Sequence, residues 1–188
     1  MVEVLTGLDR LRQAAFDQHG FVTTGQALEL DVSNASLSMM VRRGRLERVG
    51  HGLYRVAQAP VSQYDEFHRA VLWAGFTETC LSHDTALDAW GISDINPNDI
   101  HITVGARRRI VRALPKFYVV HKQDLEPKQI TWWEGIPTVT AATAVEQCVE
   151  AGTPTYLIRQ ALERSAPTGI ISKPERDRLA GLLEARHG

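Results

Sequence analysis

Ser82, His83 and Asp84 have the three side-chain types of a hydrolase triad. In such a triad a base activates the nucleophile and a carboxylate orients the base, so the three side chains must converge. Consecutive residues point in different directions and cannot form this relay. Ser82 instead suits the cap of a helix that begins near Thr85, and His83 suits a packing or hydrogen-bonding role. The pattern predicts no catalytic triad.

A second set, Asp99 with Glu126, Pro127 and Lys128, has the spacing of the acids and the lysine in metal-dependent nucleases. In those sites Glu and Lys lie on a strand beside the metal ion, whereas a proline between them indicates a loop. The seven histidines also lack metal-ligand spacing, such as two residues four apart on one helix face. We predict no catalytic residue, metal site or cofactor, and keep a metal-dependent nuclease as an alternative.

Positive charge is concentrated in two segments, although the 188-residue chain carries 21 Lys+Arg against 22 Asp+Glu. Residues 42–55 contain five arginines and one acid, Glu47. Residues 107–128 contain seven Lys or Arg and two acids. Any attraction to nucleic acid must therefore come from these patches and not from the net charge of −1.

The first patch follows a pattern of two short helices joined by a tight turn. Thr23 and Gln26 have the capping-box spacing that begins the first helix. Ser33 is the expected N-cap of the second helix, which places Leu37 and Met40 on one apolar stripe with Val41. The opposite face is small, polar and basic, as suits a helix that enters a DNA major groove. The candidates for contacting DNA from this helix are Ser33, Asn34, Ser36, Ser38, Met39, Arg42 and Arg43.

Two β-prone runs, residues 46–49 and 53–56, follow this helix and enclose Gly50, His51 and Gly52. Both glycines are expected to supply the positive φ angles of a tight hairpin, which would form the wing of a winged helix-turn-helix. Arg45, Arg48 and His51 are the candidates for phosphate contacts, and Arg55 lies in the wing or points elsewhere. The alternative is a structural or protein-interaction module, with Met39 touching a partner and Arg42 paired to Glu29 or Glu47.

The expected fold class is α+β in two domains. Residues 1–58 form the winged helix-turn-helix, with an opening helix over 6–19, and residues 61–188 form a larger mixed α+β domain. In the second domain we expect helices over 65–75, 85–91 and 140–151, two later helices that begin near 153 and 172, and strands over 100–104 and 117–121. The chain shows no membrane span of roughly 18–20 apolar residues. Without a secretory signal at its start, and with Cys80 and Cys148 expected to be buried free thiols, it is expected to be cytoplasmic.

A series of short motifs follows the winged helix-turn-helix: LSHDTAL at 81–87, Trp90-Gly91, IHITV at 100–104, Arg107 to Arg109, Val120-His121 and GIPTVT at 135–140. With these motifs in this order the chain resembles the AbiEi-type antitoxins, which also begin with a winged helix-turn-helix. The resemblance implies an antitoxin of a toxin-antitoxin, or abortive infection, system that represses its own operon. Its partner would be a nucleotidyltransferase-like toxin, neutralised directly or indirectly by the C-terminal domain. Family members often carry an Arg-Thr pair and an Asp in the helix after the GIP turn, whereas this chain has Ala142 before Thr143 and Glu146 as the acid, so we assign that helix no role.

The second basic patch has three open interpretations. Arg107, Arg108, Arg109 and Arg112 would extend the DNA footprint, contact the toxin or its RNA substrate, or form a solvated turn between strands. A ligand-responsive repressor without antitoxin activity is a further alternative, and it would need an apolar pocket in the second domain.

Overall fold

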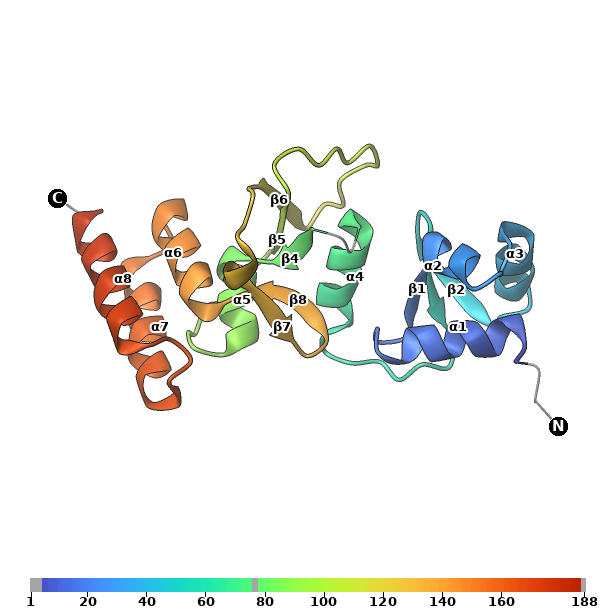
Figure 1. Cartoon of the computed structure of the whole chain (residues 1–188), viewed down its shortest axis with the longest axis horizontal. Coiled ribbons are helices and arrows are strands. Elements are labelled where there is room, and N and C mark those ends of the chain that lie inside the picture. Colours follow the sequence, from blue (N-terminus) through green and yellow to red (C-terminus); the bar gives the residue numbers. More distant parts are fainter. Residues whose placement is uncertain (1–4, 76–77, 187–188) are drawn as a thin grey trace. The chain divides into compact units, whose positions relative to one another are not determined.

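The structure is a computed structural model that describes residues 5–75 and 78–186. The ends of the two predicted domains, residues 1–4 and 187–188, lie outside the described residues. The chain divides into two compact units, Met1–Gly75 and Phe76–Gly188. Figure 1 shows the helices and strands of both units, which together are mixed α+β, so the predicted fold class is confirmed.

The first unit has the elements of a winged helix-turn-helix. Two helices and a short strand open it, a helix and a hairpin follow, and one further helix ends it. In order they are α1 (Gly7–Phe16), β1 (Phe21–Thr23), α2 (Thr24–Glu29), α3 (Asn34–Arg42), β2 (Leu46–Gly50), β3 (Leu53–Val56) and α4 (Asp65–Ala74). The strands form an antiparallel sheet in the order β1-β3-β2. The hairpin β2-β3 is the predicted wing, whereas β1 was not predicted because it is only three residues long.

The helix caps in this unit form where their local spacing predicts them. Thr23 Oγ1 accepts a hydrogen bond from the Gln26 amide at 3.2 Å, and the Gln26 side chain accepts one from the Thr23 amide at 2.9 Å. Ser33 Oγ accepts from the Ser36 amide at 3.2 Å and begins α3. Each bond satisfies an amide that has no partner within its helix.

A small apolar core holds these elements together. Leu11 of α1, Val22 of β1, Leu37 of α3 and Leu46 of β2 are all fully buried in one cluster. Helix α1 packs on β1 and β3, and α3 packs on β2. The position of α3 is thus set by burial of its apolar stripe.

Helix α4 belongs to the first unit, although the sequence analysis grouped its residues with the second domain. Asp65 at its start pairs with Arg55 of β3 at 3.2 Å. The His68 ring stacks on Phe21 with 6.2 Å between ring centroids. These contacts join residues ten or more positions apart, and the composition of the linker near residue 60 does not reveal them.

The second unit combines a five-stranded sheet with four helices. Its elements are β4 (Thr79–Leu81), α5 (His83–Trp90), β5 (Ile100–Val104), β6 (Tyr118–Lys122), the 3₁₀ helix η1 (Pro127–Gln129), β7 (Ile130–Trp133), β8 (Ile136–Val139), α6 (Ala141–Ala151), α7 (Thr155–Thr168) and α8 (Lys173–Ala185). The strand order is β6-β5-β4-β8-β7. Strand β5 is parallel to β6, and β4 is parallel to β8; the other neighbours are antiparallel.

The sequence analysis predicted β5 and β6 to within one residue at each end but did not predict β4, β7 or β8. The motif that begins at Gly135 contains the second turn residue of the hairpin formed by β7 and β8, and continues through β8. Glu134 and Gly135 both have positive φ, at 47° and 74°, as a tight two-residue hairpin turn requires. Pro137 argues against a strand prediction at β8, because proline has no amide hydrogen to donate to a neighbouring strand.

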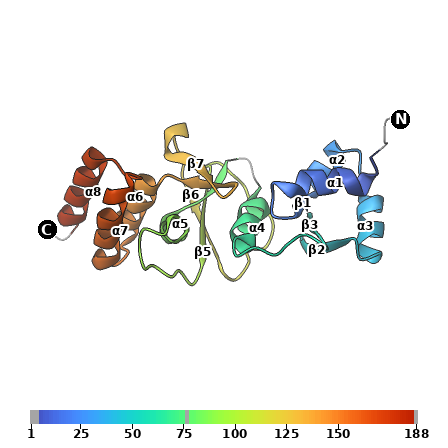
Figure 2. The ribbon, with the colours of Figure 1, turned by 90° about the horizontal axis from the view of Figure 1, so that it is seen from below.

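Helices α6, α7 and α8 lie side by side in Figures 1 and 2. They share one core with α5, in which four side chains are fully buried: Leu87, Val145, Ile158 and Leu179. The predicted ends of α6 at Thr140 and Gly152 are confirmed. Among the described residues, no helix is both long and apolar enough to cross a membrane.

Candidate nucleic-acid interface

Helix α3 presents the polar face that its sequence predicts. Leu37 is fully buried, and Met40 and Val41 pack partly buried against the same core. On the other side, Met39 is 40% exposed, and Arg42 and Arg43 are exposed. The face is therefore open to a partner along the helix and ends in two cations.

The arginines around the end of α3 carry free positive charge. Among the described residues, Arg42, Arg43 and Arg45 take part in no ion pair, so the pairing of Arg42 with Glu29 or Glu47 is not realised. Unpaired guanidinium groups can bind phosphate oxygens or the guanine edge in bidentate fashion. The geometry therefore gives this end of α3 the chemistry of an anion-binding surface.

The first turn of α3 contributes small polar groups. The hydroxyls of Ser33 and Ser36 are 3.0 Å apart, and Ser38 Oγ donates to the Asn34 carbonyl at 2.9 Å. These bonds keep the hydroxyls close to the helix surface, while the Asn34 side chain is exposed. A helix inserted in the major groove needs short, polar side chains in its first turn, because these let it come close to the base edges.

The wing places two exposed basic side chains after α3. Arg48 lies on β2, where its Nε donates to the Gly50 carbonyl at 3.4 Å, and His51 is at the tip. Only part of the glycine prediction holds: Gly52 has φ 67°, whereas Gly50 is not among the described glycines with positive φ. The ladder shifts register between Arg48 and Gly50, and this irregularity makes the turn with one left-handed glycine.

Arg55 is buried, and it does not belong to the exposed surface of the wing. It is 9% exposed, and its Nη2 donates to the carbonyls of Ala59 and Pro60 at 3.0 and 2.8 Å as well as to Asp65. Its guanidinium also lies over the Phe21 ring, 5.8 Å from the centroid. Arg55 therefore connects the wing to the segment that leads into α4.

The second basic patch lies in a long connection and not in a simple turn between strands. Since β5 and β6 are parallel, residues 105–117 must return along the length of the sheet before β6 begins. Arg107, Arg109 and Arg112 are exposed on this connection, and Arg108 is half-buried. The patch therefore offers cations on a loop of the second unit.

The two enzyme-like patterns do not form active sites. Ser82 is buried at the N-cap of α5, where its hydroxyl is 3.0 Å from His83 Nδ1, while Asp84 Oδ1 accepts from Thr153 Oγ1 at 2.8 Å and from Cys148 Sγ at 3.2 Å. Asp84 thus orients other groups and does not complete a relay. Glu126 pairs with Lys128 at 2.7 Å, with both side chains largely exposed at η1.

Both cysteines are buried free thiols, as predicted. Burial raises the pKa of Cys80 to about 12, and burial together with the neighbouring Asp84 raises that of Cys148. Both sulfurs are thus protonated at neutral pH and have little nucleophilic or metal-binding character.

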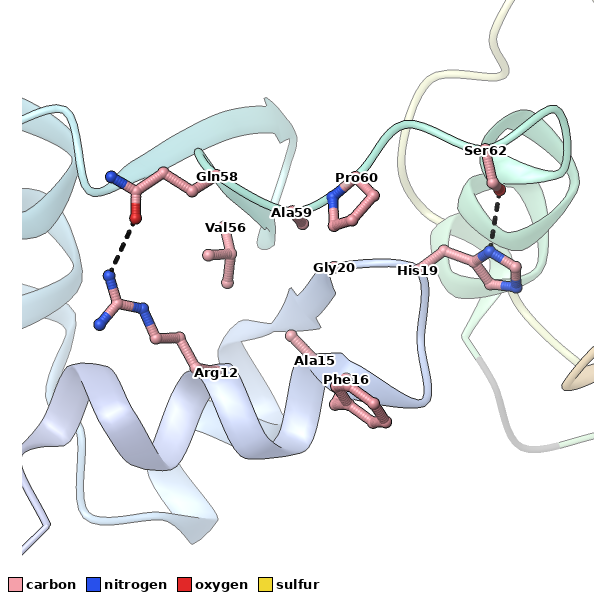
Figure 3. Close-up of a pocket in the computed structure, with 10 residues that line it drawn as sticks. All are labelled: Arg12, Ala15, Phe16, His19, Gly20, Val56, Gln58, Ala59, Pro60 and Ser62. Carbon is pink, nitrogen blue, oxygen red and sulfur yellow. Dashed lines mark hydrogen bonds between the residues drawn. The ribbon is translucent and has the colours of Figure 1, made fainter.

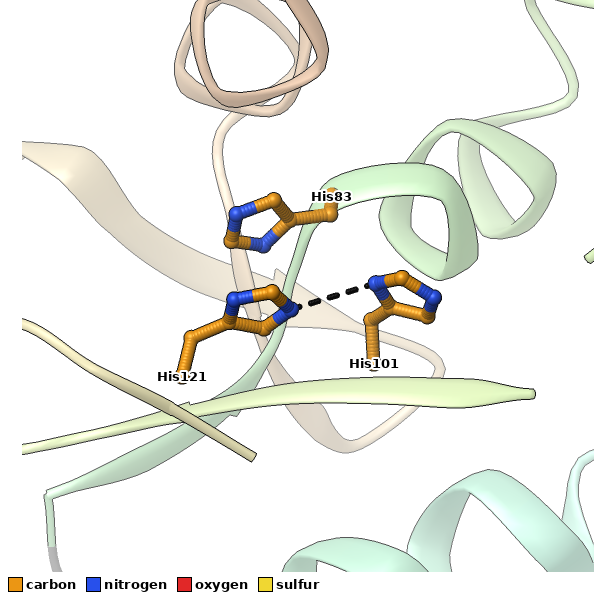
Figure 4. Close-up of side chains that lie close together, drawn as sticks. All are labelled: His83, His101 and His121. Carbon is orange, nitrogen blue, oxygen red and sulfur yellow. Dashed lines mark hydrogen bonds between the residues drawn. The ribbon is translucent and has the colours of Figure 1, made fainter. Parts of the chain in front are cut away.

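The sequence analysis missed a cluster of three histidines in the second unit. His83, His101 and His121 lie together, as Figure 4 shows, although they are 18 and 20 positions apart in the sequence. Each histidine belongs to a sequence motif near the end of an expected helix or strand, and this position was the only sign of the cluster. It does not predict that the three side chains meet unless the neighbouring strands are known.

An apolar pocket of about 400 Å³ lies in the first unit, between α1 and the end of the wing (Figure 3). Phe16, Val56 and Pro60 contribute to its wall, and the bond between His19 Nδ1 and Ser62 Oγ, 2.9 Å long, closes one end. The alternative of a ligand-responsive repressor would need an apolar pocket in the second domain, whereas this pocket lies in the first unit. Its presence in the first unit follows from the return of residues 57–62 past α1.

The whole chain has a fold in common with a solved structure, the RV2827C protein from Mycobacterium tuberculosis. The TM-score is 0.59 over 98% of this chain and 78% of that chain, with 15% sequence identity. At this identity the likeness shows the fold alone. The comparison with curated proteins finds no match.

The N-terminal part of the chain also matches a protein-family model, whose description is transcriptional regulator, AbiEi antitoxin. The match covers residues 9–57, which run from α1 to the end of the wing. The match agrees with the AbiEi resemblance stated in the sequence analysis and is a similarity over residues 9–57. The motifs at residues 81–140, on which that resemblance was based, lie outside the matched residues.

Proposed function

We propose that this protein binds double-stranded DNA at its own promoter through α3 and the wing, and thereby represses its operon. The observation that carries the proposal is the exposed face of α3, which ends in Arg42 and Arg43 without ion-pair partners among the described residues. The family match of the same segment supports a regulatory role.

We assign the side chains of the interface to two kinds of DNA contact, with base edges and with backbone phosphates. The side chains proposed to contact base edges are Asn34, Ser36, Ser38, Met39, Arg42 and Arg43. Arg45, Arg48 and His51 would hold phosphates, and Ser33 would fix the start of the helix next to the backbone. One winged helix covers a short half-site, so useful affinity calls for two copies on an inverted repeat, with half-sites one or more helical turns apart.

The experiment is a binding titration of fluorescent upstream DNA at several salt concentrations, with the full chain. Arg42→Ala and Arg43→Ala should each cost about 1–3 kcal/mol if they read guanine, with relaxed preference at one base position. Arg48→Ala should weaken all sequences alike and reduce the salt slope by about 1. Arg69→Ala is the matched control, because Arg69 lies on α4 and pairs with Glu66. Unchanged binding by the Arg42→Ala/Arg43→Ala double variant contradicts the proposal.

For the second unit we infer a role in counteracting a nucleotidyltransferase-like toxin, directly or indirectly. The exposed cations at Arg107, Arg109 and Arg112 support an anionic partner, whether DNA, an acidic face of the toxin or its RNA substrate. Identification of a nucleotidyltransferase-like gene beside this one, and co-expression with its product, test the role. Replacement of the three arginines by glutamate should abolish rescue of growth if the patch meets the toxin or its RNA. If the triple replacement weakens promoter binding and leaves rescue intact, the patch binds DNA. If the unaltered protein does not rescue growth, the antitoxin role is contradicted.

The apolar pocket supports a second candidate function, regulation by a small apolar ligand. The pocket adjoins Val56 at the end of the wing, so an occupant could alter how the wing is held. A thermal-shift screen of metabolites against the full chain tests this, with Ala15→Phe as the variant that fills the pocket. A ligand that stabilises the unaltered protein and Ala15→Phe equally does not bind there.

A further inference from the structure

Neighbouring elements bring the three histidines of the second unit together. In the parallel ladder, Thr103 of β5 stands opposite His121 of β6, and His101 stands opposite Val119. Residues two apart share a sheet face, so His101 and His121 project from the same face. His83 is the first residue of α5, which packs on β5, and its ring covers theirs (Figure 4).

The ring nitrogens are close enough to share one ligand. One nitrogen from each of the three residues lies within 4.8 Å of the other two. His121 Nε2 and His101 Nδ1 are 3.2 Å apart, and the rings of His83 and His121 stack with centroids 3.6 Å apart. Among the described residues this is the only group of three or more histidine, cysteine or acidic side chains with such convergence.

A carboxylate lies beside the three rings. Asp84 is near enough to all of them for its negative charge to favour positive charge at the cluster. The charge of the surroundings therefore suits a bound cation.

The surroundings hold His83 beside the other two histidines. Ser82 Oγ is 3.0 Å from His83 Nδ1. The His83 amide donates to Gln147 Oε1 at 3.1 Å, and Gln147 Nε2 donates to Gln123 Oε1 at 3.2 Å. The backbone of His83 has φ 51°, a conformation that costs energy in a residue with a β-carbon. These contacts hold the ring over the sheet in spite of that cost.

We propose that His83, His101 and His121 form a binding site for a divalent transition-metal ion of the zinc type. Neutral imidazole nitrogens suit zinc, cobalt and nickel, and do not suit magnesium or calcium. In tetrahedral coordination with bonds of about 2.0–2.1 Å, two ligand nitrogens are about 3.3 Å apart, close to the spacing of His121 and His101. Because the rings of His83 and His121 stack face to face, coordination by His83 requires its ring to turn about χ2 and Nδ1 to give up its contact with Ser82 Oγ.

A bound ion would join the start of α5 to the edge strand β6 and its neighbour β5. Its effect is therefore on the stability of the second unit and on the fixed placement of the connection between these strands, which carries Arg107 to Arg112. The site shares no residue with the DNA contacts proposed for α3 and the wing, since all of its ligands lie in Phe76–Gly188 and those contacts lie in Met1–Gly75.

The experiment uses untagged full-length protein, stripped with a chelator and titrated with Co²⁺ and Zn²⁺. We expect one equivalent of Co²⁺ to give the visible absorption of a tetrahedral ion, Zn²⁺ to displace it, and Mg²⁺ in excess to leave it unchanged. His101→Gln and His121→Gln, both half-buried, should weaken binding at least about 100-fold, since loss of an outer-shell partner alone costs about 10–100-fold.

His51→Gln is the matched control, because it removes an exposed histidine of the wing and leaves the cluster intact. Circular dichroism verifies that each variant is folded. The proposal is overturned if the folded, unaltered protein binds no stoichiometric Co²⁺ or Zn²⁺, or if His101→Gln and His121→Gln bind as tightly as His51→Gln. DNA binding by α3 is measured separately, and either result leaves it unaffected.

Discussion

The buried ion pair between Arg55 and Asp65 should contribute strongly to the stability of the first unit. The side chains are 10% and 15% exposed, and one guanidinium nitrogen donates to Asp65 and to the carbonyls of Ala59 and Pro60. Arg55→Met keeps an apolar stem over Phe21 but removes every one of these bonds. Breaking a fully buried pair costs about 3–5 kcal/mol, and the residual exposure here reduces the expected loss to about 2–4 kcal/mol.

Hydrogen exchange followed by mass spectrometry measures this loss in the intact chain, because it reports separately on peptides of residues 7–74. A loss of 2–4 kcal/mol corresponds to protection reduced by about 30- to 1,000-fold in the core amides of this unit. Peptides of the second unit should keep their protection. Asp65→Asn should have a similar effect, and the double variant should lose less than the sum, because the two groups act on each other.

Arg48→Met provides the comparison on the neighbouring strand. Arg48 is exposed, so its loss should change stability by less than about 0.5 kcal/mol while it weakens DNA binding. The opposite effects of the two substitutions separate a structural arginine from a phosphate-binding one. If Arg55→Met leaves protection equal to that of Arg48→Met, the ion pair does not hold the wing to the segment before α4.

Three further predictions concern the same unit. Leu37→Ala should destabilise it by about 2–5 kcal/mol, measured by urea unfolding with hydrogen exchange as the local probe, because Leu37 is fully buried in its core. Ser33→Ala should cost about 1 kcal/mol by the same measurement, and Ser33→Asp should retain most of the stability, since either oxygen caps the first turn of α3. Burial, reinforced by His19 and opposed by Asp65, lowers the pKa of His68 to about 4. In the unfolded chain His68 takes up a proton below about pH 6.5, whereas in the folded chain it stays neutral down to about pH 4. The free energy of unfolding is therefore unaffected by His68 above about pH 6.5 and falls between there and pH 4, by at most about 1.4 kcal/mol per pH unit. His68→Phe should remove this part of the pH dependence, and an unchanged slope would refute the assignment.

The features of the DNA-binding unit that were predictable are those that depend on neighbours in the chain. The capping pairs of Thr23 with Gln26 and of Ser33 with the Ser36 amide join residues three apart, so their spacing alone places the helix ends. The burial of Leu37 follows from helical periodicity once Ser33 is the cap. The exposed basic face of α3 is the other side of the same pattern.

The direction of Arg55 was not predictable, because alternation along β3 places a side chain on a face but does not say what lies above it. That depends on the return of the chain through Ala59 and Pro60. The same limit applies to Gly50: the register shift in the wing left only Gly52 with a positive φ. A shift of one residue in a ladder is a property of two strands together.

Local sequence thus decided where the helices begin and end, which faces they bury and where positive charge gathers, because each depends on residues within a few positions of one another. Tertiary structure decided the rest. The parallel pairing of β5 and β6 brings His101 and His121 to one sheet face beneath His83, and it makes the arginine-rich segment a long return connection. Strand neighbours and their direction are set by packing across the whole unit, so residues 18 and 20 positions apart meet for a reason that no local pattern contains.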